Sequence, residues 1–176
     1  GHLVAASEVQ SWFDLDEVVF VPTGAPWQKA DKVVSAAEDR YLMTVIATAS
    51  NPRFSVSRVD VDRAGPTYTI DTLETLRADH SCDLFLVVGS DVAVSLDGWH
   101  RVADLRDAVT LAVVDREDVA PSIPPAGWRA ERVHMPRLDV SSTDLRRRIA
   151  AGESVEFLVP PPASRILRAR GLYTGE

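Results

Sequence analysis

The stretch Leu84-Phe85-Leu86-Val87-Val88-Gly89-Ser90-Asp91 decides the fold of this chain. Five consecutive apolar residues closed by a glycine are typical of a strand buried on both faces, as in a parallel sheet. Ligands of such sheets bind beyond the carboxyl ends of the strands. There Gly89 permits close approach of a ligand, and Asp91 is suited to ribose hydroxyls. The same residues also fit a turn in which Ser90 or Asp91 caps a short helix.

Further apolar runs alternate with helical patterns along the rest of the chain. This alternation predicts an α/β fold with a doubly wound parallel sheet. A length of 176 residues suits a single domain, 1–176, with C-terminal helices from about residue 141. The other strands are predicted at 17–21, within 53–60, at 109–114 and at 132–135.

Two of the predicted helices begin with hydroxyl side chains that suit an N-cap. Ser35 is followed three residues later by Glu38, the pattern of a capping box. After the Gly65-Pro66 turn, Thr67 or Thr69 is expected to cap the next helix.

The composition excludes several classes of protein. The chain has 45% hydrophobic and 26% charged residues, as in ordinary globular proteins, and no apolar run near the ~20 residues that span a bilayer. Cys82 is the only cysteine, so an internal disulfide and a cysteine metal cluster are excluded. A net charge of −7 argues against a nucleic-acid partner. No secretory signal is recognised, which favours the cytoplasm.

Three hydroxyl residues, Ser141, Ser142 and Thr143, open a predicted helix, and Arg146 lies one turn further on. The N-terminus of a helix presents N–H groups without partners and a partial positive charge. Added hydroxyls and a guanidinium make it a suitable phosphate site. An ordinary N-cap needs only one such hydroxyl, and this segment alone leaves both interpretations open.

Other candidates are weaker when each is taken by itself. A helix that begins at residue 2 or 3 places His2 at its positive end, where an imidazole can bind phosphate; a terminal pair without a role is the alternative. Trp99 can stack on a pyridine or purine ring, although a core position is commoner. The only lysines, Lys29 and Lys32, lie in a predicted loop at 22–34, where they can contact phosphates or stay solvated.

The chain has no nucleophile–histidine–acid arrangement, no histidine pair with metal-ligand spacing and no Walker lysine motif. His80, His100 and His134 are dispersed, and we interpret them as structural. Without a nucleophile, direct displacement is favoured, in which positioning and charge stabilisation supply the catalysis.

Taken together, these segments resemble the nucleotidyltransferase superfamily. Gly1-His2-Leu3 is similar to the second half of its (H/T)-x-G-H signature, and residues 140–146 match its I-S-S-T-x-x-R signature with Val for Ile. The segments between them resemble the bacterial nicotinate-nucleotide adenylyltransferases, especially actinobacterial members. These segments are residues 22–29, residues 65–73 and Gly89-Ser90-Asp91 with Trp99.

The resemblance implies a Rossmann-like fold and an enzyme of NAD biosynthesis that uses magnesium. Such an enzyme transfers the adenylyl group of ATP to nicotinate mononucleotide and releases pyrophosphate. The resemblance also implies catalytic roles for His2 and Arg146. The implied ATP contacts are His2, Gly89, Asp91, Ser141, Ser142, Thr143 and Arg146, and the implied substrate contacts are Lys29, Thr67, Tyr68, Trp99 and Arg116.

Two departures from the family pattern stand out. The family's first strand and its G-T-F-D-P segment precede the signature and are not in this sequence, so the sequence as given is expected to lack that strand. Arg116 is followed by Glu117-Asp118, where family members commonly carry Pro-Gly.

Alternative functions remain open at this point. A sister adenylyltransferase would use nicotinamide mononucleotide or phosphopantetheine, although Trp99 and Thr67 argue against phosphopantetheine. A non-catalytic nucleotide-binding module is an alternative hypothesis, in which the protein is not an enzyme. The partners expected are small molecules, with no nucleic acid and no membrane. The oligomeric state, including a homo-oligomer, is left open.

Overall fold

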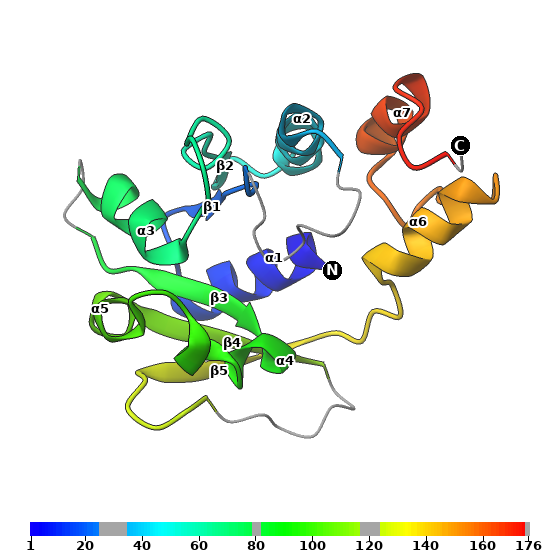
Figure 1. Ribbon diagram of the computed structural model, residues 1–176. Helices are drawn as coiled ribbons and strands as arrows, with labels where there is room; N and C mark the ends of the chain where they lie inside the picture. The colour runs from blue at the N-terminus through cyan, green and yellow to red at the C-terminus, as the bar shows by residue number, and fades with distance from the viewer. Residues whose placement is uncertain (25–34, 79–81, 117–123, 175–176) are drawn as a thin grey trace. The chain divides into compact units, whose positions relative to one another are not determined.

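The computed structural model describes residues 1–24, 35–78, 82–116 and 124–174 (Figure 1). The chain divides into two compact units. The first unit comprises Gly1, Glu17–Thr67 and Asp139–Glu176, and the second comprises His2–Asp16 and Tyr68–Leu138. No helix among the described residues is long and apolar enough to cross a membrane.

A three-stranded parallel sheet forms the centre of the second unit. Its strands β3 (Phe85–Gly89), β4 (Thr110–Arg116) and β5 (Ala130–Met135) are adjacent in that order. Gly89 pairs with Val114, so the ends of β3 and β4 lie at the same edge. The predicted strands at 84–88, 109–114 and 132–135 are thus confirmed as members of a parallel sheet.

Helices cover both faces of this sheet, which explains why its strands are apolar throughout. On one face, Val9 of α1 (His2–Phe13) is fully buried with Ala112 and Val133 of the sheet. On the other face, Leu111 and Val113 pack with Leu105 and with residues of the neighbouring helices. These helices are α3 (Thr69–Arg77), α4 (Ser90–Ala93), the 3₁₀ turn η2 (Leu96–Gly98) and α5 (Val102–Ala108).

Helix α1 runs opposite to the strands that it covers. Its last residue, Phe13, stacks on Phe85 at the start of β3, with ring centroids 4.5 Å apart. Twelve helical residues extend about 18 Å, so the N-terminal end of α1 lies toward the edge where the strands end (Figure 1). His2 is the first residue of this helix. The helix start predicted at residue 2 or 3 is confirmed.

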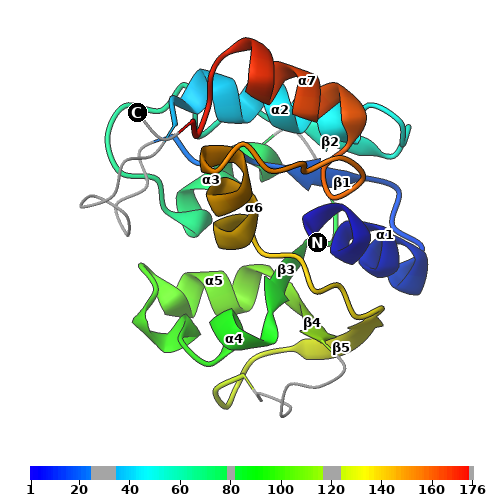
Figure 2. The same ribbon diagram turned by 90° about the vertical axis from the view of Figure 1, so that its right-hand side faces the viewer.

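The first unit contains a second, two-stranded parallel sheet. Its strands are β1 (Val18–Phe20) and β2 (Phe54–Val56). Helix α2 (Ala37–Thr48) packs on β2 and lies beside α7 (Pro161–Ala169) in both views (Figure 2). Helix α6 (Ser142–Ala150) precedes α7, as expected for C-terminal helices from about residue 141. The α/β class and the parallel pairing are therefore as the sequence predicts.

The capping box predicted for α2 is wrong. The N-cap is Ala36, which makes no side-chain cap hydrogen bond. The two residues predicted to form the capping box have other partners. The Ser35 hydroxyl shares a 2.7 Å hydrogen bond with the Tyr173 hydroxyl, and Glu38 pairs with Arg58 at 2.7 Å. The hydrogen bond from Arg58 lowers the pKa of Glu38 below its usual value of 4.5.

Candidate active site

At the end of β3, the structure brings Gly89 and Asp91 into close proximity. A Cβ atom at Gly89 would lie 2.5 Å from Oδ1 of Asp91, which is closer than real Cβ contacts allow. A side chain at position 89 would therefore displace the Asp91 carboxylate. The N-cap of α4 is Gly89, without a side-chain cap bond, so the alternative that Ser90 or Asp91 caps this helix is wrong. The exposed Asp91 carboxylate is instead available at the end of the strand.

Two predicted substrate contacts, Tyr68 and Trp99, lie partly buried against the same core cluster, which includes Leu96 and Leu105. The Tyr68 ring also contacts the ring of His100, with centroids 4.2 Å apart. The Trp99 ring therefore contributes to the core and is not fully enclosed. Its stacking on a ligand ring stays a prediction. His100, interpreted as structural, belongs to this aromatic group.

Arg101, which directly follows Trp99 and His100 in the chain, connects this segment to α3. Its guanidinium pairs with Glu74 at 2.6 Å, with Asp104 at 2.7 Å and with Asp71 at 3.4 Å. The hydrogen bond from Arg101 lowers the pKa of Glu74. The Arg101 backbone is left-handed, with φ of 53°, a conformation that surrounding contacts must support. Arg101 was not predicted as a site residue, because no local sequence pattern indicates its distant partners on α3.

Thr67 is a buried residue whose hydroxyl has no partner in the part of the chain that the structure describes. The N-cap of α3 is Tyr68, and no side chain caps this helix; the prediction that Thr67 or Thr69 caps it is wrong. A buried hydroxyl without a hydrogen bond destabilises a fold. Such a group is a candidate for contact with a bound ligand.

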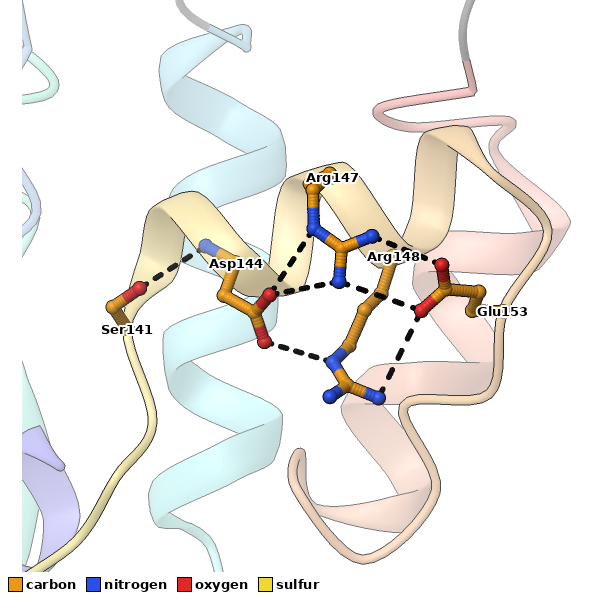
Figure 3. Close-up of polar contacts among 5 residues, drawn as sticks. All are labelled: Ser141, Asp144, Arg147, Arg148 and Glu153. Atoms are coloured by element: carbon orange, nitrogen blue, oxygen red, sulfur yellow. Dashed lines mark hydrogen bonds and ion pairs between the residues drawn. The ribbon is translucent and has the colours of Figure 1, made fainter.

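At the start of α6, Ser141 is the N-cap, and its Oγ accepts a hydrogen bond from the Asp144 N–H at 3.1 Å (Figure 3). The capping interpretation is therefore confirmed for Ser141. Ser142 and Thr143 are exposed in the first turn. Their hydroxyls and the nearby N–H groups form the part of the helix end that suits an anion.

The three consecutive arginines of α6 have different surroundings. Arg147 and Arg148 hydrogen-bond Asp144 at 2.9 and 2.8 Å, and Arg147 also pairs with Glu153 at 2.9 Å (Figure 3). Hydrogen bonds from Arg148 and Arg147 lower the pKa of Asp144. Arg146 is exposed, and no carboxylate of the described residues pairs with it. Its guanidinium instead lies over the Tyr173 ring, 5.3 Å from the centroid.

The remaining candidates are at or beyond the ends of elements. Arg116 is the last residue of β4, in register with Met135, and Lys29 lies outside the described residues. The neighbouring Asp115, which was not predicted from the sequence, is a buried carboxylate whose Oδ2 lies 3.2 Å from Nε of Arg132. The only sequence pattern that could have indicated Asp115 is an acidic residue near the end of an apolar strand.

The predicted site residues fall in both units. The second unit holds His2, Tyr68, Gly89, Asp91, Trp99 and Arg116, and the first holds Thr67, Ser141, Ser142, Thr143 and Arg146. Within the described residues, no three His, Cys, Asp or Glu side chains form a group able to hold a metal.

The fold and these residues define a class of protein. The chain belongs to the cytidylyltransferase-like family, whose model matches residues 1–148. Two chains of the Plasmodium falciparum nicotinic acid mononucleotide adenylyltransferase have the same fold, with TM-scores of 0.75 and 0.74 over 98% of this chain. One is complexed with APC and the other with NaAD. The matches cover 89% and 88% of the two Plasmodium chains, at 15% and 16% sequence identity.

Relatives in actinobacteria narrow the class further. A protein of Saccharopolyspora erythraea is 52% identical over 100% of this chain and 84% of its own length. A protein of Streptomyces coelicolor is 51% identical over 100% of this chain and 95% of its own length. Both carry the name "Probable nicotinate-nucleotide adenylyltransferase". Within its class, the chain is a member of the nicotinate-nucleotide adenylyltransferase family.

Proposed function

We propose that this protein transfers the adenylyl group of ATP to nicotinate mononucleotide. An oxygen of the mononucleotide phosphate attacks the α-phosphorus of ATP and forms the new P–O bond. The bond from the α-phosphorus to the bridging oxygen breaks, and pyrophosphate leaves. The second product is nicotinate adenine dinucleotide.

The observation that carries this proposal is the isolated positive charge of Arg146 on α6. Carboxylates pair with the guanidinium groups of Arg147 and Arg148, whereas Arg146 has no such partner among the residues that the structure describes. A guanidinium beside two exposed hydroxyls and a helix N-terminus suits a triphosphate. We assign Ser142, Thr143 and Arg146 to the ATP phosphates, with the N-cap Ser141 orienting the first turn.

The second unit is proposed to bind the sugar and the pyridine ring. Gly89 leaves room for the Asp91 carboxylate, which accepts hydrogen bonds from the adenylyl ribose. Trp99, which packs against the same core cluster as Tyr68, stacks on the nicotinate ring. The remaining assignments follow the family resemblance: His2 to the ATP phosphates, Thr67 to the nicotinate group, Lys29 to the substrate phosphate and Arg116 to the substrate.

Catalysis then depends on position and charge, since none of the assigned residues has the role of a covalent nucleophile. His2 and Arg146 stabilise the negative charge that develops as pyrophosphate leaves. Magnesium fits this set of residues as an ion carried by the ATP phosphates, because Mg²⁺ is commonly bound through substrate phosphates and few protein ligands. When bound, it offsets part of the phosphate charge.

The test is pyrophosphate release by the full-length gene product. We expect release only when ATP and nicotinate mononucleotide are both present, and the dinucleotide should appear in equal amount by chromatography. A folded protein that binds ATP and releases no pyrophosphate would instead be a nucleotide-binding module. Parallel assays with nicotinamide mononucleotide and phosphopantetheine determine the acceptor; a higher kcat/KM with either one would replace our assignment of the substrate.

A further inference from the structure

Tyr173, in the segment after α7, lies directly under the candidate phosphate-binding guanidinium. Cζ of Arg146 is 5.3 Å from the centroid of the Tyr173 ring, within the range of a cation–π interaction. Tyr173 is partly buried, and its backbone is left-handed, with φ of 63°. A tyrosine persists in this conformation only where surrounding contacts support it.

The contacts of the Tyr173 hydroxyl supply that support. This hydroxyl shares a 2.7 Å hydrogen bond with the Ser35 hydroxyl. The Ser35 carbonyl in turn accepts a 3.2 Å hydrogen bond from Nε of Arg40. Arg40 also donates from Nη2 to the Gly24 carbonyl at 2.9 Å and from Nη1 to the Thr23 carbonyl. The ring of Tyr173 is thus fixed at its far end by residues of another part of the first unit.

A ring and a carboxylate have different effects on an arginine. A carboxylate partner, such as Asp144 beside Arg147 and Arg148, orients the guanidinium and also offsets its charge. An aromatic face orients the guanidinium and leaves its N–H groups and net charge available. For an arginine that must bind phosphate, the ring is therefore the better support.

We propose that Tyr173 is a positioning residue, which holds the Arg146 guanidinium in the orientation that binds the triphosphate of ATP. The inference rests on the function proposed above. Tyr173 touches Arg146 and is not assigned to the substrates. Loss of its ring should therefore weaken ATP binding and leave the binding of nicotinate mononucleotide unchanged.

The first experiment compares Tyr173→Leu with Tyr173→Phe in the full-length protein. Leu removes the ring face, and it is unbranched at Cβ like Tyr, so the backbone cost is matched. We expect Tyr173→Leu to raise the KM for ATP about two- to fivefold, the size of an exposed cation–π interaction. Tyr173→Phe keeps the ring, loses the bond to Ser35, and should fall between Leu and wild type.

Tyr41→Leu is the matched control. The Tyr41 ring also lies under a guanidinium, that of Arg58 at 4.7 Å, and Tyr41 is partly buried like Tyr173. Its arginine is not assigned to a substrate. Tyr41→Leu should leave the KM for ATP unchanged. An equal rise of this KM in both Leu variants would mean that Tyr173 acts only on general stability, and would overturn the proposal.

A double-mutant cycle tests whether Tyr173 acts through Arg146. When Arg146→Ala is already present, Tyr173→Leu should cause no further loss of kcat/KM for ATP. A further two- to fivefold loss would refute the positioning role, as would an equal rise in the KM values of both substrates.

Calorimetric titration of ATP separates this inference from the proposed function. If no dinucleotide forms, but Tyr173→Leu weakens ATP binding and Tyr41→Leu does not, the positioning role holds and the transferase assignment fails. If the wild type makes the dinucleotide and Tyr173→Leu binds ATP with unchanged affinity, the transferase assignment holds and the positioning role fails.

Discussion

The start of α6 and the end of β3, the two regions proposed to contact the nucleotide, present their polar groups in different ways. At α6, side chains carry the chemistry: exposed hydroxyls and a guanidinium project from the first turns. At the end of β3, the absence of a side chain is decisive, because the Asp91 carboxylate occupies the space that a Cβ of residue 89 would need. The proposed binding at the start of α6 should therefore be sensitive to the removal of side-chain atoms. The proposed binding at the end of β3 should be sensitive to the addition of a Cβ atom at residue 89.

The two regions also differ in how their charges are organised. At α6, Asp144 and Glu153 pair with Arg147 and Arg148, so carboxylates offset the charge of two of the three arginines. At the end of β3, Asp91 is an exposed carboxylate. An anionic phosphate group is therefore expected at the first region, and neutral hydroxyl donors are expected at the second.

The largest effect is expected for Arg146→Ala. Loss of the guanidinium removes the proposed charge-assisted contact with the ATP phosphates, and kcat/KM for ATP should fall about 100-fold. Steady-state rates of pyrophosphate release measure this change. Arg147→Ala is the control on the same helix, because Asp144 and Glu153 pair with that arginine; its rate should stay within a few-fold of wild type. Similar losses in both variants would mean that the helix as a whole is basic and that Arg146 has no special role.

The next largest effect is expected for Gly89→Ala, which tests the other region. The new methyl group displaces the Asp91 carboxylate, so kcat/KM for ATP should fall roughly tenfold, the cost of a lost hydrogen bond to a charged group. The fold should survive with a change in unfolding free energy within about 1 kcal/mol, measured by urea denaturation.

Gly98→Ala is the control for this substitution, since a Cβ at Gly98 meets no atom within 4 Å. It should leave both activity and stability near wild type. Normal ATP kinetics in Gly89→Ala would show that the position of the Asp91 carboxylate is irrelevant to binding.

The comparison also shows what the sequence can predict. The run of apolar residues before Gly89 and the hydroxyls at 141–143 are local patterns, and the structure has the expected strand and helix start. The capping box predicted at Ser35 does not form, and the Ser35 hydroxyl instead bonds to Tyr173, 138 residues away in the chain. The assigned roles of the site residues stay predictions.

Arg101 and Tyr173 had no signal in the sequence for the same physical reason. The partners of Arg101 on α3 lie 27 and 30 residues away, and folding rather than local pattern brings them together. A tyrosine near the C-terminus likewise indicates nothing until the structure places it under Arg146.

A smaller effect is expected for Thr67→Val, which tests a buried hydroxyl in place of an exposed polar group. The Thr67 hydroxyl has no hydrogen bond among the described residues, so its replacement by a methyl group should stabilise the free protein by about 1 kcal/mol. The KM for nicotinate mononucleotide should rise about fivefold, the equivalent of one hydrogen bond. Chemical denaturation and steady-state kinetics measure the two effects.

Thr72→Val is the matched control for that change. Thr72 is equally buried, but its hydroxyl donates to the Tyr68 carbonyl at 3.2 Å. This substitution should destabilise the protein by about 0.5–1 kcal/mol and leave the KM values unchanged. If Thr67→Val also destabilises the protein, its hydroxyl has a structural role in the free state.

The smallest effect is expected from the ion pairs of α6. Arg148 and Arg147 hold the pKa of Asp144 below its usual value of 3.8, so the carboxylate favours folding. This contribution is complete above that usual value and is lost as the pH falls through the lower pKa of the folded state. Because these groups are solvent-exposed, the contribution is small and is screened by salt.

Asp144→Asn isolates this contribution. The thermal midpoint of the variant should lie slightly below that of wild type at pH 7, and the difference should shrink as the pH falls below 3.8. Added salt should reduce the difference at pH 7. A decrement that is the same at every pH and salt concentration would instead indicate a packing role for Asp144. In that case the arginines of α6 would not be neutralised by this carboxylate, and the contrast drawn between Arg146 and its two neighbours would lose its electrostatic basis.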